Sequence, residues 1–257
     1  MSFSLVPGFA QRYPKEEGDD AALVSIWSGL SPESGTDGCV LIETCCTTID
    51  QAVAAEARGA GRIELCVDLS VGGVTPPREL VREVVQALTI PVNVLIRPGS
   101  ESPVTDGRPD GAFSAADFVY DEAALRQMVD DMAYCKTVGA AGIVVGALTP
   151  DGAIDRPAMR RLVAAAAPLP VTFHRAFDVC TADPFIALDQ VIALGCARLL
   201  TSGMAATAWD GRRLIALLVR RAAARLIVIP GCGVTPDNLA ALAAATRATE
   251  IHGTRIP

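Results

Sequence analysis

The sequence predicts an α/β fold of the (β/α)8 kind, the TIM barrel, in which eight parallel strands alternate with helices. Eight short apolar runs alternate with helical patterns along the chain, and glycine junctions at 59–61, 139–142 and 195 end a helix directly before a strand. The 257 residues, 51% of them hydrophobic, can bury the core of one barrel or of two small domains. An open doubly wound sheet is the alternative, but the first strand is not followed by the GxGxxG motif that would support it.

The expected elements follow one another through short connections. Prolines at 91 and 170 end a helix just before a β-branched run. Repeated βα units of this length give parallel strands joined by right-handed crossovers. The expected strands lie near 40–45, 62–66, 92–97, 142–147, 171–175, 197–202, 226–230 and 249–253. The expected helices lie near 48–58, 77–88, 121–138, 156–167, 183–194, 210–223 and 236–245.

Two irregular regions flank this pattern. We expect residues 1–38 to form an N-terminal extension and residues 39–257 to form the barrel domain. Because the sequence stops soon after the eighth strand, the barrel is expected to lack its last helix, and a helix at 21–30 would cover the flank left open. The alternative for the extension is a disordered tail or a subunit contact. The loop at 98–119 follows the third strand and is either a lid over the catalytic face or a solvated loop.

Charge and composition exclude several classes of partner. The formal net charge of -7 and the isoelectric point near 4.9 argue against nucleic acid and against an acidic membrane surface. The sequence has no transmembrane run and no signal-peptide pattern, so we expect a cytoplasmic protein. Its eight cysteines are then reduced thiols, because no CxxC pair indicates a zinc or redox centre. The oligomeric state is left open, a homo-oligomer included.

Charged residues and thiols fall on the inward-facing positions of the first three strands. Strict alternation turns Glu43 and Cys45 inward on the first strand, and Glu64 and Cys66 on the second, while Cys46 faces the helix layer. Arg97 faces inward at the end of the third strand. The same alternation also turns Arg62, Asn93 and Glu250 inward. In barrel enzymes the carboxyl ends of the strands are the functional end.

The fifth strand leads into a polar sequence, His174-Arg175-Ala176-Phe177-Asp178. An imidazole near carboxylates can exchange protons near pH 7, and guanidinium groups can hold an anionic substrate. The alternative for Glu43, Glu64 and Arg97 is a structural ion-pair network, since buried charges need partners. His174 alone is more often a structural histidine, and Cys45 and Cys66 are more often ordinary core thiols.

Glycine-containing loops follow the sixth and seventh strands. Thr201, Ser202 and Gly203 form the first, and the second contains Gly231 and Gly233. Backbone N–H groups in such loops can bind phosphate or carboxylate, which barrels often do after their last strands. His252, inward on the eighth strand, completes the candidate substrate-binding set. The alternative is a pair of tight turns.

Several ordered motifs resemble the CutC family of copper homeostasis proteins. The resemblance spans about 40–253 and rests on Arg62-Ile63-Glu64-Leu65-Cys66, Gly72-Gly73-Val74-Thr75-Pro76, Ile96-Arg97-Pro98, Val145-Gly146-Ala147-Leu148-Thr149, 171–178 and Leu200-Thr201-Ser202-Gly203. It implies a TIM barrel and a role in cytosolic copper handling, with a Cu(I) site at Cys45 or Cys46 together with Cys66. One departure is that Arg97-Pro98 is followed by Gly99-Ser100, where the family usually has a second arginine.

Two functional classes therefore compete. As a copper protein, the chain would bind Cu(I), a soft ion that thiolates favour. As an enzyme, it would perform acid–base chemistry on a small anionic or phosphorylated metabolite, with a catalytic set of Glu43, Glu64, Arg97, His174, Arg175 and Asp178. A purely structural barrel would explain neither the charged interior nor the glycine loops.

Overall fold

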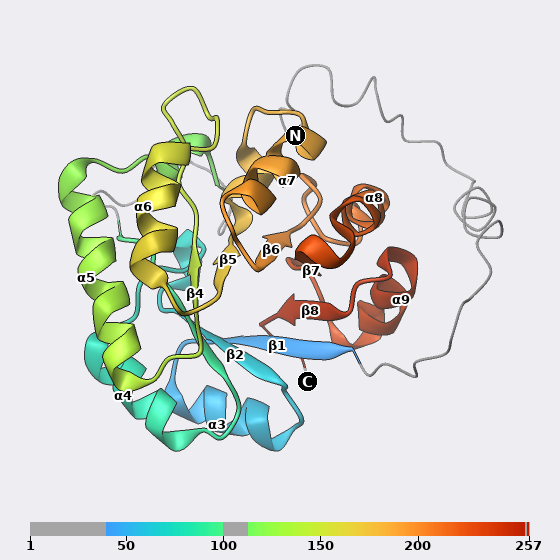
Figure 1. The fold of residues 1–257 in the computed structure, drawn as a ribbon. Coiled ribbons are helices and arrows are strands. Elements are labelled where there is room, and N and C mark those ends of the chain that lie inside the picture. The colour runs from blue at the N-terminus through green and yellow to red at the C-terminus, as the bar shows by residue number, and fades with distance from the viewer. Residues whose placement is uncertain (1–39, 100–112, 255, 257) are drawn as a thin grey trace. The chain divides into compact units, whose positions relative to one another are not determined.

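The computed structural model describes residues 40–99, 113–254 and 256. Its eight strands are parallel and hydrogen-bonded in the order β7-β6-β5-β4-β3-β2-β1-β8, with helices around them (Figure 1). The strands are β1 (Leu41–Cys46), β2 (Arg62–Leu65), β3 (Val92–Leu95), β4 (Gly142–Val145), β5 (Val171–Phe173), β6 (Arg198–Thr201), β7 (Ile227–Pro230) and β8 (Glu250–Gly253). Strands β7 and β8, at the two ends of this order, lie in contact. The predicted (β/α)8 barrel is therefore confirmed.

Seven α-helices of the described residues connect the strands, and most begin at a capping residue. The carboxylates of Asp121, Asp155 and Asp183 each accept a hydrogen bond from a backbone N–H in the first turn of their helix. Gly139 ends a helix in the left-handed region at φ 88°, as predicted. The helices are α3 (Ile49–Ala57), α4 (Arg78–Ala87), α5 (Glu122–Val138), α6 (Arg156–Ala166), α7 (Pro184–Ala193), α8 (Arg212–Ala222) and α9 (Pro236–Thr246).

The strand register brings the polar positions of β1, β2 and β8 to the same level of the barrel. Glu43 lies opposite Arg62 on one side and His252 on the other, and Cys45 lies opposite Glu64. The alternate positions, such as Ile63, are fully buried against the helices. The interior of the barrel is thus polar near β1, while the apolar core lies between strands and helices.

Strands β3, β4 and β5 end about two residues earlier than predicted. The reason is clearest at β5, which ends at Phe173 rather than at 175. The next residue, His174, accepts a hydrogen bond from the backbone N–H of Ala176 through its Nδ1 atom and so begins a short 3₁₀ helix, η3 (Arg175–Val179). His174 is therefore the cap of this turn and not a member of the strand.

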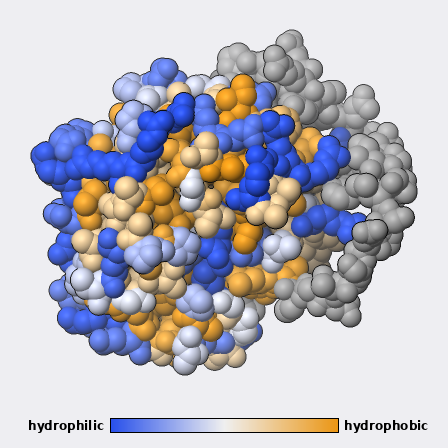
Figure 2. Space-filling model, viewed as in Figure 1, coloured by the Kyte–Doolittle hydropathy of each residue, from blue (hydrophilic) through white to orange (hydrophobic). Residues whose placement is uncertain are grey.

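The predicted helix at 21–30 and most of the loop at 98–119, for which a lid and a solvated loop are the alternatives, lie outside the described residues. Within the described ranges, no helix is both long enough and apolar enough to cross a membrane. Figure 2 shows hydrophilic and hydrophobic residues interspersed over one face of the molecule.

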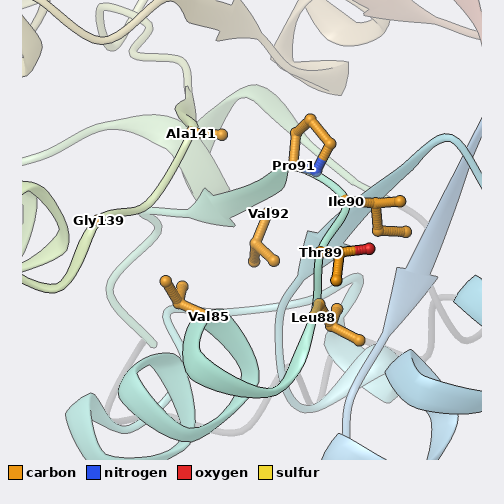
Figure 3. Close-up of a pocket in the computed structure, with 8 residues that line it drawn as sticks. All are labelled: Val85, Leu88, Thr89, Ile90, Pro91, Val92, Gly139 and Ala141. Atoms are coloured by element: carbon orange, nitrogen blue, oxygen red, sulfur yellow. The ribbon is translucent and has the colours of Figure 1, made fainter.

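A hollow between the end of α4, the start of β3 and the α5–β4 connection lies at the amino-terminal edge of the barrel (Figure 3). Thr89, on its wall, donates its backbone N–H and its hydroxyl to the carboxylate of Glu56. Its other lining side chains are apolar. This end of a barrel is associated with stability rather than with chemistry, and a functional site is expected at the opposite end.

Candidate functional site

Two thiols meet inside the barrel at the carboxyl ends of β1 and β2. The Sγ atoms of Cys45 and Cys66 lie 3.2 Å apart. Both side chains are buried, and they pack with Leu95 and Val144 in one cluster. The hydrogen bond to Cys66, together with burial, raises the pKa of the Cys45 thiol well above its usual value. Of the three cysteines predicted for a metal site, Cys45 and Cys66 are thus brought together.

Cys46 lies on the other side of β1 from Cys45, as strand alternation predicts. Burial and the nearby Cys66 thiol raise the pKa of its thiol to about 11, and the guanidinium of Arg58, the cap residue of α3, acts on it in the opposite direction. Arg58 belongs to the helix layer, which is the side of β1 that Cys46 faces.

A carboxyl group and an imidazole lie next to Cys45. One ligand atom each from Cys45, Glu64 and His252 falls within 4.8 Å of the others. Glu64 Oε2 is buried and has no hydrogen-bond partner among the described residues, with His252 Nδ1 at 3.9 Å. Burial, with a smaller contribution from the charge of Glu43, raises the pKa of Glu64 to about 7. Glu64 is therefore a buried carboxyl poised between its two protonation states.

Glu43, two residues before Cys45 on β1, belongs to a buried ion-pair network. Its carboxylate accepts hydrogen bonds from Arg62 Nε at 2.5 Å and from Asn93 at 3.3 Å, and His252 Nδ1 lies 2.8 Å away. Burial alone would raise the pKa of Glu43, but the hydrogen bond and charge of His252 and the charge of Arg62 lower it to about 2. Glu43 is thus an ionised group that orients its neighbours.

The cation of this network is not the one considered from sequence, Arg97. Arg62 also donates to Glu250 at 2.5 Å, and Glu250 accepts from Arg198 at 3.0 Å. Arg97 instead follows the end of β3, and its Nη1 donates to the carbonyls of Val71 at 2.8 Å and Gly73 at 2.6 Å. Arg97 reaches over the β2–α4 loop because β3 ends two residues before it.

The guanidinium of Arg97 lies over the rings of Phe113 and Phe118, with its Cζ atom 5.2 Å from each ring centroid. The guanidinium of Arg175 also lies over the Phe113 ring, at 5.3 Å. Phe113 is seated on Gly72, whose φ is +82°, and a Cβ there would lie 2.2 Å from Phe113 Cε1. One aromatic ring therefore contacts both arginines predicted for the site.

His174 packs against the ring of Phe118. Its ring centroid is 4.9 Å from that of Phe118, and the side chain is buried. Burial, followed by the charges of Arg97 and Arg175, lowers the pKa of His174 to about 3. Its Nε2 atom has no hydrogen-bond partner among the described residues. His174 is therefore a neutral donor rather than an acid that exchanges its proton near pH 7.

Asp178 holds the loops after β5 and β6 together. Its carboxylate accepts hydrogen bonds from Thr201 Oγ1 at 2.5 Å, from the N–H of Ser202 at 2.9 Å and from that of Met204 at 3.1 Å. Arg175 Nε donates to the same carboxylate at 2.9 Å, and Arg175 Nη2 lies 3.3 Å from Ser202 Oγ. These contacts give Asp178, Thr201 and Ser202 a positioning role.

The predicted glycines all sit where side chains do not fit. A Cβ on Gly203 would lie 2.5 Å from the carbonyl oxygen of Gly211, and one on Gly231 would lie 2.5 Å from Leu200 Cδ1. Gly233 has φ +69° and faces Thr207. Close packing is therefore enough to explain these glycines, and their binding of phosphate stays a prediction.

The residues that sequence reasoning missed are of two kinds. Strand alternation places Arg62 and Glu250 inward, but only the structure shows that Arg62 links the carboxylates of Glu43 and Glu250. Phe113 had no detectable signal, because it lies in an irregular loop with no periodicity. Its position depends on Gly72 and on the two arginines, all distant in sequence.

Comparisons with known proteins agree with this fold. The CutC family model matches residues 40–257. A CutC family protein from Parabacteroides distasonis is 46% identical over 214 residues, which cover 82% of this chain and 81% of the relative. The mouse copper homeostasis protein cutC homolog is 41% identical, with 86% of this chain and 76% of the relative covered. A solved CutC structure from Streptococcus agalactiae superimposes with a TM-score of 0.75 at 32% identity, covering 85% of this chain and 100% of that one. By sequence and by fold, the chain belongs to the CutC family.

Proposed function

We propose that this protein binds a Cu(I) ion at the thiol pair Cys45–Cys66 and acts in copper homeostasis in the cytoplasm. The single observation that carries the proposal is the 3.2 Å separation of the two buried Sγ atoms. Cu(I) is a soft ion for which thiolates are the preferred protein ligands. Relatives named as copper homeostasis proteins support the assignment. The cytoplasmic setting is supported by the thiols, because that compartment keeps them reduced.

The surroundings of the thiol pair fit a metal cargo. His252 Nδ1 faces Glu43 at 2.8 Å, which leaves Nε2 as the ring atom available to an ion. A carboxylate that fixes the orientation of a ligating imidazole is a common partner in metal sites. The buried, apolar neighbours Leu95 and Val144 exclude water from the sulfurs. Cys45 and Cys66 would be the ligands, with His252 as a third donor beside them.

The thiol pair lies closer together than two sulfurs bound to opposite sides of one ion. Metal–sulfur bonds in proteins are about 2.3 Å long, so a linear site needs sulfurs roughly 4.6 Å apart. From the observed 3.2 Å separation, the sulfurs must move apart by about 1.4 Å for a linear site, and by about 0.8 Å for a three-coordinate site with angles near 120°. The imidazole of His252 is placed for that third position.

The test is a Cu(I) titration of the reduced full-length chain under anaerobic conditions, in competition with a chromophoric Cu(I) chelator. We expect one tightly bound ion per chain, lost in Cys45→Ala and in Cys66→Ala. Cys196→Ala is the matched control, since it removes a thiol that is also buried but lies two residues before β6. Equal Cu(I) affinity in all four proteins would contradict the proposal.

A further inference from the structure

A second set of donor atoms lies beside the thiol pair and shares one sulfur with it. Strand β1 lies between β8 and β2 in the barrel (Figure 1), and these three strands carry Cys45, Glu64 and His252. One sulfur, one carboxylate oxygen and one ring nitrogen from these residues all lie within 4.8 Å of one another. This group of three contains Cys45 but not Cys66. The two sets of donors therefore overlap without being the same.

The carboxyl group of Glu64 is the member of this group that lacks a partner. Glu64 is 5% exposed, and its Oε2 atom has no hydrogen bond among the described residues. The guanidinium of Arg62 donates instead to Glu43 and Glu250. Buried polar atoms without a partner are rare in native proteins and indicate an ion, a water or a catalytic role. The thiol and the imidazole beside Glu64 favour the ion, because both are metal ligands.

We propose that Cys45, Glu64 and His252 bind a divalent transition-metal cation of the zinc class. Thiolate, imidazole and carboxylate are the protein ligands of Zn²⁺, and three protein ligands with one open position are the pattern of catalytic zinc sites. Mg²⁺ and Ca²⁺ take oxygen ligands, so the sulfur and the nitrogen argue against them. Cu(I) is satisfied by soft sulfur ligands and has no need of the carboxylate.

The spacing of the donor atoms suits a tetrahedral ion. Zinc–ligand bonds of about 2.0–2.3 Å at tetrahedral angles place neighbouring donors roughly 3.3–3.8 Å apart. No pair in the group is separated by more than 4.8 Å, so the most distant pair must close by about 1.0–1.5 Å. Glu43, 2.8 Å from His252 Nδ1, holds the imidazole ring in place as carboxylates do behind ligating histidines.

The shared sulfur makes the two ions alternatives. Cys45 cannot bind a divalent ion with Glu64 and His252 and at the same time bind Cu(I) with Cys66, so each ion should displace the other. The divalent site does not depend on Cu(I) binding, since Cys66 is not one of its ligands. The two proposals can therefore fail separately.

The test is a Zn²⁺ titration of the reduced full-length chain under anaerobic conditions, in competition with a chromophoric zinc chelator. We expect one Zn²⁺ ion per chain. Glu64→Gln keeps the size of the side chain and removes the carboxylate. We expect it to weaken Zn²⁺ binding by about tenfold or more, since even a carboxylate that only orients a ligand contributes about 10–100-fold. Glu122→Gln, which changes an exposed carboxylate on α5, is the matched control and should bind Zn²⁺ as the parent does.

Cys66→Ala separates this site from the thiol pair. This variant should lose Cu(I) and keep Zn²⁺, whereas Glu64→Gln should keep Cu(I) and lose Zn²⁺ affinity. Co²⁺ gives a second readout, because its binding to a thiolate produces sulfur-to-cobalt absorption. We expect that absorption in the parent chain and in Cys66→Ala, and its loss in Cys45→Ala.

Three results would overturn the inference. They are equal Zn²⁺ affinity in Glu64→Gln and Glu122→Gln, a loss of Zn²⁺ in Cys66→Ala as large as in Cys45→Ala, and a parent chain without sulfur-to-cobalt absorption. Zn²⁺ binding in the expected pattern by a chain that binds no Cu(I) would instead refute the copper proposal and support the divalent site.

Discussion

The neutral state of buried His174 predicts a specific pH dependence of stability. Its pKa is about 3 in the folded chain, against an ordinary value of 6.5. Below pH 6.5 the His174 imidazole therefore binds a proton in the unfolded chain but stays neutral in the folded chain. The resulting contribution of His174 to the unfolding free energy is fully present above pH 6.5 and is lost as the pH falls toward 3. The slope for one proton is about 1.4 kcal/mol per pH unit.

The titration of Glu64 changes the unfolding free energy in the opposite direction over part of the same pH range. Because its pKa is raised to about 7, its contribution is present at low pH and is lost as the pH rises from 4.5 through 7. The stability of the parent chain alone would therefore show little slope there. The difference between the parent and His174→Asn isolates the histidine, since Glu64 is common to both.

The assay is urea unfolding of both proteins, followed by circular dichroism at several pH values between 4.5 and 8. We expect the difference in unfolding free energy, parent minus His174→Asn, to be constant above pH 7. It should shrink by about 2 kcal/mol between pH 6 and pH 4.5. A difference that does not change with pH would refute a buried neutral histidine at this position.

Two further substitutions test the ion-pair network around Arg62 and the packing of Phe113 on Gly72. Arg62→Met leaves two buried carboxylates without their shared guanidinium, and should lower the unfolding free energy by about 3–5 kcal/mol, against less than about 1 kcal/mol for the exposed Arg161→Met. Equal urea midpoints for these two variants would show that the network is not buried. Gly72→Ala places a Cβ 2.2 Å from Phe113 and strains a φ of +82°, so we expect the unfolding free energy to fall by about 1 kcal/mol or more. An unchanged urea midpoint in Gly72→Ala would mean that Phe113 does not pack on Gly72.

The barrel could be predicted from sequence because its signals are local. Glycine at 139 ends a helix in the left-handed region, as it was expected to, and each connection is short enough for parallel crossovers. Strand alternation also placed Cys45, Cys66 and Glu64 correctly, since a period of two needs no knowledge of neighbours.

The pairing of charges could not be predicted in the same way. Arg97 and Arg62 are both inward by alternation, and only the early end of β3 decides that Arg97 leaves the interior while Arg62 binds Glu43. The role of His174 also depended on a local competition, because its Nδ1 takes the Ala176 N–H and ends the strand. These outcomes depend on side-chain hydrogen bonds that no sequence period records.

The most direct test of the copper proposal is X-ray absorption at the copper edge on the chain loaded with one Cu(I). The account predicts two sulfur atoms in the first coordination shell of the parent protein, and loss of the ion together with this sulfur shell in Cys66→Ala. A first shell made only of nitrogen and oxygen, or one unchanged by that substitution, would contradict a site at Cys45 and Cys66.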